Sequence, residues 1–305
     1  MIRQAAFTEG QPLLKGGLHC HTTRSDGRGT PEEVIRKHVA HGYDFLALTD
    51  HRRYNYQNFA PGSEITILPG MEIDYNFDDE GCHCFHAVCL GPERAAGNGF
   101  EQDQTFESGL VRGAADFQPV LDKVHANGNI TMYCHPEWSG TPARDFEDLR
   151  GNFAMEIWNT GCALENDMDT NAAYWDEILM QGQRIFGAAV DDGHQMDQHC
   201  VGYVMVAAEN RPSAILGALT KGAFYSSCGP EIHDFYVEDG VAHIKCSPVR
   251  FVNFCYGRYP SQMVTAKGEL VTEASFKVPP YFTYIRATMV DENGRRAWTN
   301  PIFLK

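Results

Sequence analysis

Short apolar, β-rich runs alternate with stretches of helical periodicity through the first two-thirds of the chain. This alternation is typical of βα units. The pattern predicts strands at residues 17–22, 45–49, 65–73, 86–90, 130–134, 154–159 and 185–190. It predicts further helices at residues 119–126, 172–181 and 212–221, after a first helix that begins near residue 30.

The first helix has clear start and stop signals. Thr30 is the expected N-cap, Pro31 lies in the first turn, and Glu33 is placed to complete a capping box. Gly42 is the expected C-cap, because glycine commonly ends a helix. A helix bounded in this way, followed by a strand at 45–49, supports an α/β fold.

The pattern changes near residue 228. Short strands are predicted at 235–237, 241–246, 251–255, 274–278, 283–290 and 301–304. Polar turns such as Glu238-Asp239-Gly240 separate them, and no helical period remains. We therefore predict an α/β domain in residues 1–227 and a small, sandwich-like all-β module in residues 228–305.

Composition narrows the class of protein. The 305 residues suit one large or two smaller domains. No apolar run approaches the ~18 residues of a membrane-spanning helix. The formal net charge of −15 disfavours long nucleic acids as partners. The segment Met1–Lys15 lacks the pattern of a signal peptide, so we expect a cytoplasmic protein whose ten cysteines are reduced.

Candidate metal ligands begin with His19 and His21. On a strand, residues two apart face the same side, so both imidazoles can reach one cation. Asp26 follows in the turn Ser25-Asp26-Gly27. Each of these residues alone has an ordinary structural explanation.

The same residue types recur near one predicted strand after another. They are His51, Glu72, His86, His135, Asp192 and His194. Gathered carboxylates repel one another and buried imidazoles stay unsatisfied without cations, so the series indicates a multinuclear metal site. His83 is an alternative to His86, and Asp191 to Asp192. We interpret His38 as a structural or solvated helix residue and His199 as a surface residue, with a pocket position as the alternative for His199.

These ordered motifs, over residues 15–225, resemble the PHP family, named for polymerase and histidinol phosphatase domains. The resemblance implies a distorted seven-stranded (β/α) barrel with two or three divalent ions, zinc, manganese or iron. It also implies nine ligands, with Glu72 bridging: His19, His21, Asp26, His51, Glu72, His86, His135, Asp192 and His194. We assign Glu72, Asp192 and His194 to the catalytic centre.

Two later segments, residues 222–230 and 296–301, resemble the carbaryl-hydrolase-like CehA/McbA branch of this family. The resemblance implies a PHP domain followed by a β module. Members of that branch are described as metallohydrolases or metal-dependent phosphoesterases. The resemblance leaves the substrate open.

The leading hypothesis is a phosphoesterase that cleaves a small phosphorylated molecule with a metal-activated hydroxide. Arg24, Arg52 and Arg53 lie next to predicted ligands and are candidates to bind phosphate oxygens. A hydrolase of carboxylic or carbamic esters that uses the same metals is one alternative. A non-catalytic, metal-stabilised interaction domain is another. The sequence leaves the oligomeric state open.

Overall fold

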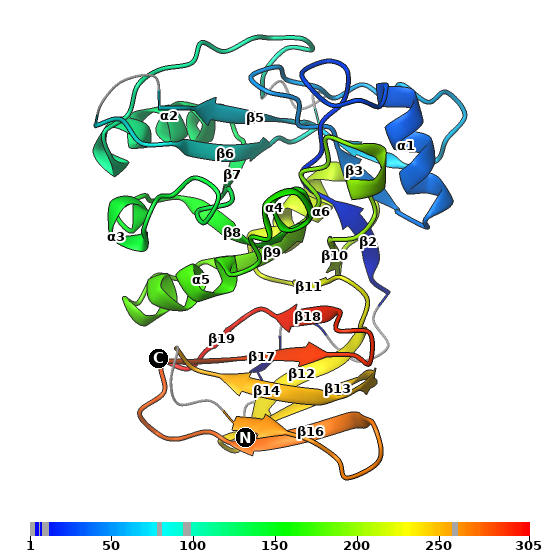
Figure 1. The fold of residues 1–305 in the computed structure, drawn as a ribbon, viewed down its shortest axis with the longest axis vertical. Coiled ribbons are helices and arrows are strands. Elements are labelled where there is room, and N and C mark those ends of the chain that lie inside the picture. Colours follow the sequence, from blue (N-terminus) through cyan, green and yellow to red (C-terminus); the bar gives the residue numbers. More distant parts are fainter. Residues whose placement is uncertain (1–3, 6, 8–11, 78–80, 94–98, 258–261) are drawn as a thin grey trace.

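The structure is a computed structural model that describes residues 4–5, 7, 12–77, 81–93, 99–257 and 262–305 (Figure 1). Part of the N-terminal segment used to predict the location of the protein therefore lies outside the described residues. The described strands form three sheets. No helix in these ranges is long and apolar enough to cross a membrane.

The largest sheet combines strands from both ends of the chain. Strands β2, β3 and β4 are parallel, and the other pairs are antiparallel. Its order is β15 (Gln262–Val264), β14 (Phe251–Cys255), β17 (Tyr284–Val290), β18 (Arg296–Thr299), β11 (Phe224–Ser227), β10 (Tyr203–Val206), β2 (Leu14–Gly17), β3 (Phe45–Ala47) and β4 (Thr66–Leu68), with β19 (Ile302–Phe303) on β17.

The second sheet has five strands, antiparallel from β5 to β7 and parallel from β7 to β9. Its order is β5 (Gly70–Tyr75), β6 (Phe85–Leu90), β7 (Ile130–Tyr133), β8 (Asn152–Asn159) and β9 (Phe186–Val190). The third sheet is antiparallel and lies toward the lower end of the molecule in Figure 1. It consists of β1 (Gln4–Ala5), β12 (Ile232–Glu238), β13 (Val241–Val249) and β16 (Val271–Lys277).

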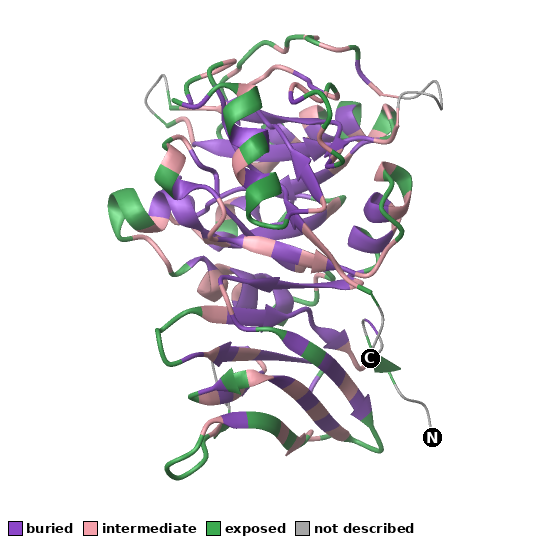
Figure 2. Ribbon diagram, turned by 90° about the vertical axis from the view of Figure 1, so that its right-hand side faces the viewer, coloured by how far each residue is buried: buried purple, intermediate pink, exposed green. Residues whose placement is uncertain are grey.

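Within the described residues, few helices accompany these sheets. They are α1 (Pro31–Ala40), α2 (Ala114–Ala126), α3 (Ala143–Phe146), α4 (Thr160–Asn166), α5 (Asn171–Met180) and α6 (Pro212–Leu219), with the 3₁₀ helix η2 (Met196–Gln198). Helix α1 has the predicted capping box: the Thr30 hydroxyl accepts from the Glu33 amide, and the Glu33 carboxylate accepts from the Thr30 amide. Buried positions concentrate in the strands, and the helices expose their outer faces (Figure 2). The α/β prediction is confirmed.

Two strand predictions need correction. Residues 17–22 are not a strand, because β2 ends at Gly17 and the backbone beyond it bonds to the loops that follow neighbouring strands. The predicted strand 65–73 is split at Pro69. Its first half, β4, pairs with β3 in the large sheet, and its second half, β5, pairs with β6 in the five-stranded sheet.

Isolated bridges join the two larger sheets at these points. His51, beyond β3, pairs in parallel with Glu72 of β5. Cys20, beyond β2, pairs in parallel with Gly193, beyond β9. The C-terminal ends of the parallel strands therefore meet around one space. Side chains from both sheets, among them Phe45 and Met132, form a shared core below it.

Five of the C-terminal strands, β14, β15, β17, β18 and β19, continue the large sheet, whereas β12, β13 and β16 belong to the separate third sheet. Strand β11 ends at Ser227, and its neighbour β18 comes from the end of the chain. Asn300, which follows β18, also contacts the five-stranded sheet. Its side-chain oxygen accepts a hydrogen bond from the backbone N–H of Gly187 in β9 at 3.0 Å. The division of the chain at residue 228 stays a prediction.

A buried ion pair connects α5 to β17. The Arg286 guanidinium donates to both carboxylate oxygens of Asp176, at 2.9 and 2.6 Å. It also lies 4.8 Å from the ring centroid of Trp175. Both partners of the pair are almost fully buried. Losing one partner would leave the other charge uncompensated in a low-dielectric interior.

We therefore expect Asp176→Asn to lower the free energy of unfolding by about 3–5 kcal/mol, measured by urea denaturation. Glu209→Ala removes an exposed partner of Arg211 and serves as the matched control, with little expected change. Equal effects of the two substitutions would show that the Asp176–Arg286 pair does not stabilise the fold.

Candidate metal centre

The nine predicted ligands converge at the meeting point of the strand ends. His19 and His21 follow β2, and Asp26 lies in the turn before α1. The others lie on or just beyond five further strands. Every one of the nine has a ring nitrogen or carboxylate oxygen within 4 Å of another member of the set. The structure thus brings all nine together.

Glu72 is the centre of this arrangement. Its side chain is 1% exposed, and both carboxylate oxygens face imidazoles. Oε2 lies 3.4, 3.2 and 3.0 Å from ring nitrogens of His19, His21 and His51. Oε1 lies 3.0 Å from Nδ1 of His86 and 3.4 Å from Nε2 of His135. One carboxylate therefore contacts five histidines.

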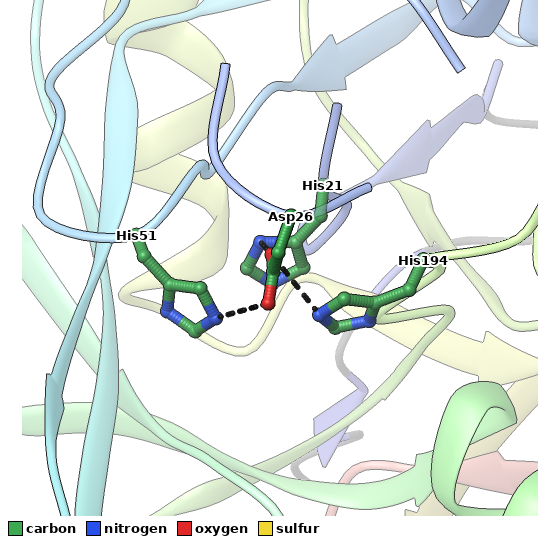
Figure 3. A group of neighbouring side chains, drawn as sticks. All are labelled: His21, Asp26, His51 and His194. Carbon is green, nitrogen blue, oxygen red and sulfur yellow. Dashed lines mark ion pairs between the residues drawn. The ribbon is translucent and has the colours of Figure 1, made fainter. Parts of the chain in front are cut away.

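Two groups of four have the geometry to hold a cation, since the ligating atoms of each group lie within 4.8 Å of one another. The first, fully buried, is His19, His21, Glu72 and Asp192. The second is His21, Asp26, His51 and His194. Figure 3 shows Asp26 between the rings of His51 and His194.

The donor atoms of these groups fit divalent metals. Glu72 Oε2 and Asp192 Oδ1 are buried and accept no hydrogen bond from the described residues. Each nevertheless lies within 3.4 Å of imidazole nitrogens. Imidazole nitrogens and carboxylate oxygens converging on one point are typical ligands of zinc and related ions.

The buried carboxylates of the cluster need positive charge close to them. Burial alone would raise the pKa of Glu72, but His51, His19 and His86 bring it well below its usual value. Burial would likewise lower the pKa of His19, and the carboxylates of Asp192, Glu72 and Glu156 raise it well above the usual value. The carboxylates therefore hold counter-charges, as protons on the rings or as metal ions.

Glu156 and Asn159 support the ligands and were not predicted. Oε1 of Glu156 lies 2.6 Å from Nδ1 of His19, and Oε2 accepts from the backbone N–H of His135. The Asn159 amide donates to Glu156 Oε2 and Asp192 Oδ2. A glutamate in the middle of the mainly apolar predicted strand 154–159 was the sequence signal that could have revealed Glu156.

Two aspartates next to predicted ligands have supporting positions as well. Asp50 is buried and accepts from the backbone and hydroxyl groups of Thr22 and Ser25, which holds the loop that carries Asp26. Oδ1 of Asp74 lies 3.2 Å from Nδ1 of His51. The second oxygen of Asp74 pairs with the guanidinium of Arg52.

The structure also bears on the two open alternatives. His83 faces Asp145 at 3.5 Å, whereas His86 contacts Glu72. The Asp191 carboxylate accepts backbone N–H groups from residues 200–202, whereas Asp192 faces His19 and His21. His86 and Asp192 are thus the members of each pair that join the cluster.

Of the three candidate phosphate-binding arginines, the structure brings only Arg52 to the cavity beside the cluster. Arg24 and Arg53 both pair with Asp103, and neither lines the cavity. Arg28 lines it instead and was missed, because it comes two residues after Asp26 in a turn whose shape the sequence did not define.

The cavity has a volume of about 630 Å³. It is lined by ligand side chains, such as Glu72 and His135, together with Trp138, Asn76 and Asn166. The Trp138 ring centroid lies 5.1 Å from that of His135 and 5.8 Å from that of His86. This volume is in the usual range for small-molecule sites.

An α/β fold with such a cluster at its strand ends is typical of a metal-binding protein. The PHP domain family model matches residues 17–174, more than half of the chain. The chain therefore belongs to the PHP domain family, and the resemblance inferred from its motifs is confirmed. The CehA/McbA branch stays a prediction.

Two curated proteins share short regions with this chain. The 5'-3' exoribonuclease of Haemophilus influenzae is 36% identical over 73 residues, which are 23% of this chain and 27% of that protein. The DNA polymerase/3'-5' exonuclease PolX of Bacillus subtilis is 30% identical over 91 residues, 21% of this chain and 16% of that protein. The chain thus spans about a quarter or less of the length of these relatives.

Among solved structures, one similar chain is a two-domain protein from Bacteroides vulgatus that contains a predicted PHP-like metal-dependent phosphoesterase. It is 13% identical, with a TM-score of 0.48, and the match covers 97% of both chains.

Glu156→Gln should weaken metal binding about 10- to 100-fold, because supporting carboxylates orient ligating histidines and raise their basicity. Competition with a chromophoric chelator measures this affinity. Glu64→Gln, an exposed loop substitution, is the matched control and should have no effect. Unchanged affinity in Glu156→Gln would contradict the supporting role.

Metal affinity should rise with pH. Burial lowers the pKa of His194, but the hydrogen bond to Asp26 and the charge of Asp192 raise it to about 9. The ring is therefore protonated at pH 7 and must lose that proton to bind a metal. We expect the apparent affinity to rise by roughly tenfold per pH unit for each displaced proton between pH 6.5 and 8.5. Calorimetry in matched buffers tests this, and a flat profile would be the contrary result.

Proposed function

We propose that this chain is a metal-dependent phosphoesterase that cleaves a small phosphorylated substrate. The observation that carries the proposal is the cluster of nine predicted ligands centred on Glu72, seven of which line a cavity together with Arg28 and Arg52. The cluster provides ligands for divalent metals, and the two arginines provide positive charge to bind the anionic oxygens of a substrate. Membership of the PHP domain family supports the same reaction class.

We further propose that two or three divalent ions, zinc, manganese or iron, occupy the cluster. His19, His21, Glu72 and Asp192 would hold one ion, and His21, Asp26, His51 and His194 another. His86 and His135, on the other oxygen of Glu72, would complete a third. Divalent ions at such sites lower the pKa of water and stabilise negative charge on substrate oxygens.

The strand arrangement supports the proposed barrel. The bridges His51–Glu72 and Cys20–Gly193 join the edges of the five-stranded sheet to the parallel strands β2 and β3. We propose that these strands close into the distorted barrel expected for the family, with the metal cluster at its C-terminal end.

The arginines of the cavity have different surroundings and therefore different proposed roles. Arg52 pairs with Asp74, which also contacts His51, so its guanidinium is held beside the cluster. The Arg28 side chain is exposed, and within the described ranges no carboxylate pairs with it. Its backbone N–H donates to the His194 carbonyl, which places the residue at the cavity. Arg28 is thus free to bind a phosphate oxygen.

Turnover of phosphate esters is the direct test. Manganese-reconstituted protein should hydrolyse a phosphomonoester or a phosphodiester, and His51→Ala should abolish this activity. Turnover of an aryl carbamate ester alone would favour the carboxylic or carbamic ester alternative. No turnover of any substrate, with metals bound, would contradict the enzymatic proposal and favour an interaction domain.

Arg28→Ala tests the phosphate site. A charge-assisted hydrogen bond contributes about 1.5–3 kcal/mol, so KM for the phosphate substrate should rise roughly 10- to 150-fold. Arg24→Ala and Arg53→Ala are the comparison, because both arginines pair with Asp103 instead of lining the cavity. A larger rise in KM for Arg24→Ala or Arg53→Ala than for Arg28→Ala would contradict the proposal and assign phosphate binding to the residues predicted from sequence.

A further inference from the structure

A second group of metal-ligating side chains lies outside the cluster around Glu72. It consists of His38 on α1, Asp191 just beyond β9 and His199 just beyond η2. Their exposed fractions are 1%, 2% and 2%. One ligating atom from each lies within 4.8 Å of the others. None of the three has a role in the proposed reaction.

His38 presents a lone pair to this group. Its Nδ1 lies 2.8 Å from the Val34 carbonyl oxygen, which can only accept, so Nδ1 carries the proton. In the neutral ring Nε2 is then unprotonated. That atom is buried and has no hydrogen-bond partner among the described residues. A buried acceptor of this kind is costly unless something binds it.

His199 has even fewer hydrogen-bond partners than His38. Both of its ring nitrogens are buried, and neither has a hydrogen-bond partner in the described part of the chain. Its ring centroid lies 5.5 Å from that of His38. A Cβ added at Gly193 would lie 2.5 Å from His199 Nδ1, so the ring packs directly against the backbone of the Asp192–His194 turn.

Both imidazoles are in the form that binds metals. Burial and the nearby charge of Lys37 lower the pKa of His38 to about 4. Burial, together with His38 and Lys37, lowers the pKa of His199 to about 3. The rings are therefore neutral at pH 7. Asp191 adds an anionic oxygen, held in place by the N–H groups of Cys200 and Gly202 at 2.6 and 2.7 Å.

We propose that His38, Asp191 and His199 bind one further divalent cation of the zinc class. Two imidazoles and a carboxylate form a familiar three-ligand set for zinc, with water as a fourth ligand. The site is buried and has a structural role: it ties helix α1 to the end of β9, directly before Asp192. It thereby holds the turn that carries Asp192 and His194.

Metal stoichiometry tests this proposal without any assay of activity. The full chain is saturated with zinc, desalted and analysed for bound metal by mass spectrometry. His38→Gln and His199→Gln should each lose one equivalent, and the double variant should lose that same single equivalent. His41→Gln, an exposed histidine at the end of the same helix, is the control and should lose none. Full stoichiometry in His38→Gln and His199→Gln would overturn the proposal and leave a buried water as the occupant.

A second measurement needs no substitution, in case the variants fail to fold. Anomalous diffraction from wild-type crystals, recorded on both sides of the zinc edge, locates each bound ion. We expect a peak among His38, Asp191 and His199, separate from the peaks around Glu72. Peaks around Glu72 without one at His38 would refute the additional site while leaving the proposed function intact.

Discussion

The Glu72 carboxylate is buried among five imidazoles that come from four segments of the chain. A charge removed from water in this way is stable only when positive partners surround it closely. The histidines must therefore reach Glu72 together. The strand ends and loops that carry them are positioned by this requirement, and the cavity above them follows from it.

Backbone hydrogen bonds hold these segments in place. The Glu72 N–H donates to the Thr49 carbonyl at 3.0 Å, and the Arg52 N–H donates to the Glu72 carbonyl at 2.7 Å. On the other side, the Asp192 N–H donates to the His19 carbonyl at 3.0 Å. These backbone bonds thus hold the segments that carry His51 and Glu72, and those that carry His19 and Asp192, beside one another. A site prepared in this way loses little freedom when it binds a cation.

Strand β11 and Asn300 support this arrangement through contacts with β9. The Ser226 hydroxyl accepts from the Ala189 N–H and donates to the Gly187 carbonyl. Asn300, near the end of the chain, accepts from the Gly187 N–H. Both contacts support β9, the strand that leads to Asp192 and His194. Through Asn300 the C-terminal segment therefore supports the strand that leads to the cluster, although it contributes no predicted ligand.

Local signals in the sequence determined the first helix, the α/β class and the residue types of the metal centre. A capping box spans four residues, and His19 and His21 are two apart, so neighbours along the chain carry this information. The tertiary structure alone decided the split at Pro69 and the supporting role of Glu156. It alone placed Arg28 instead of Arg24 at the cavity, and His38 beside His199. These outcomes depend on contacts between residues far apart in the chain, whose distances are set only when the sheets pack together.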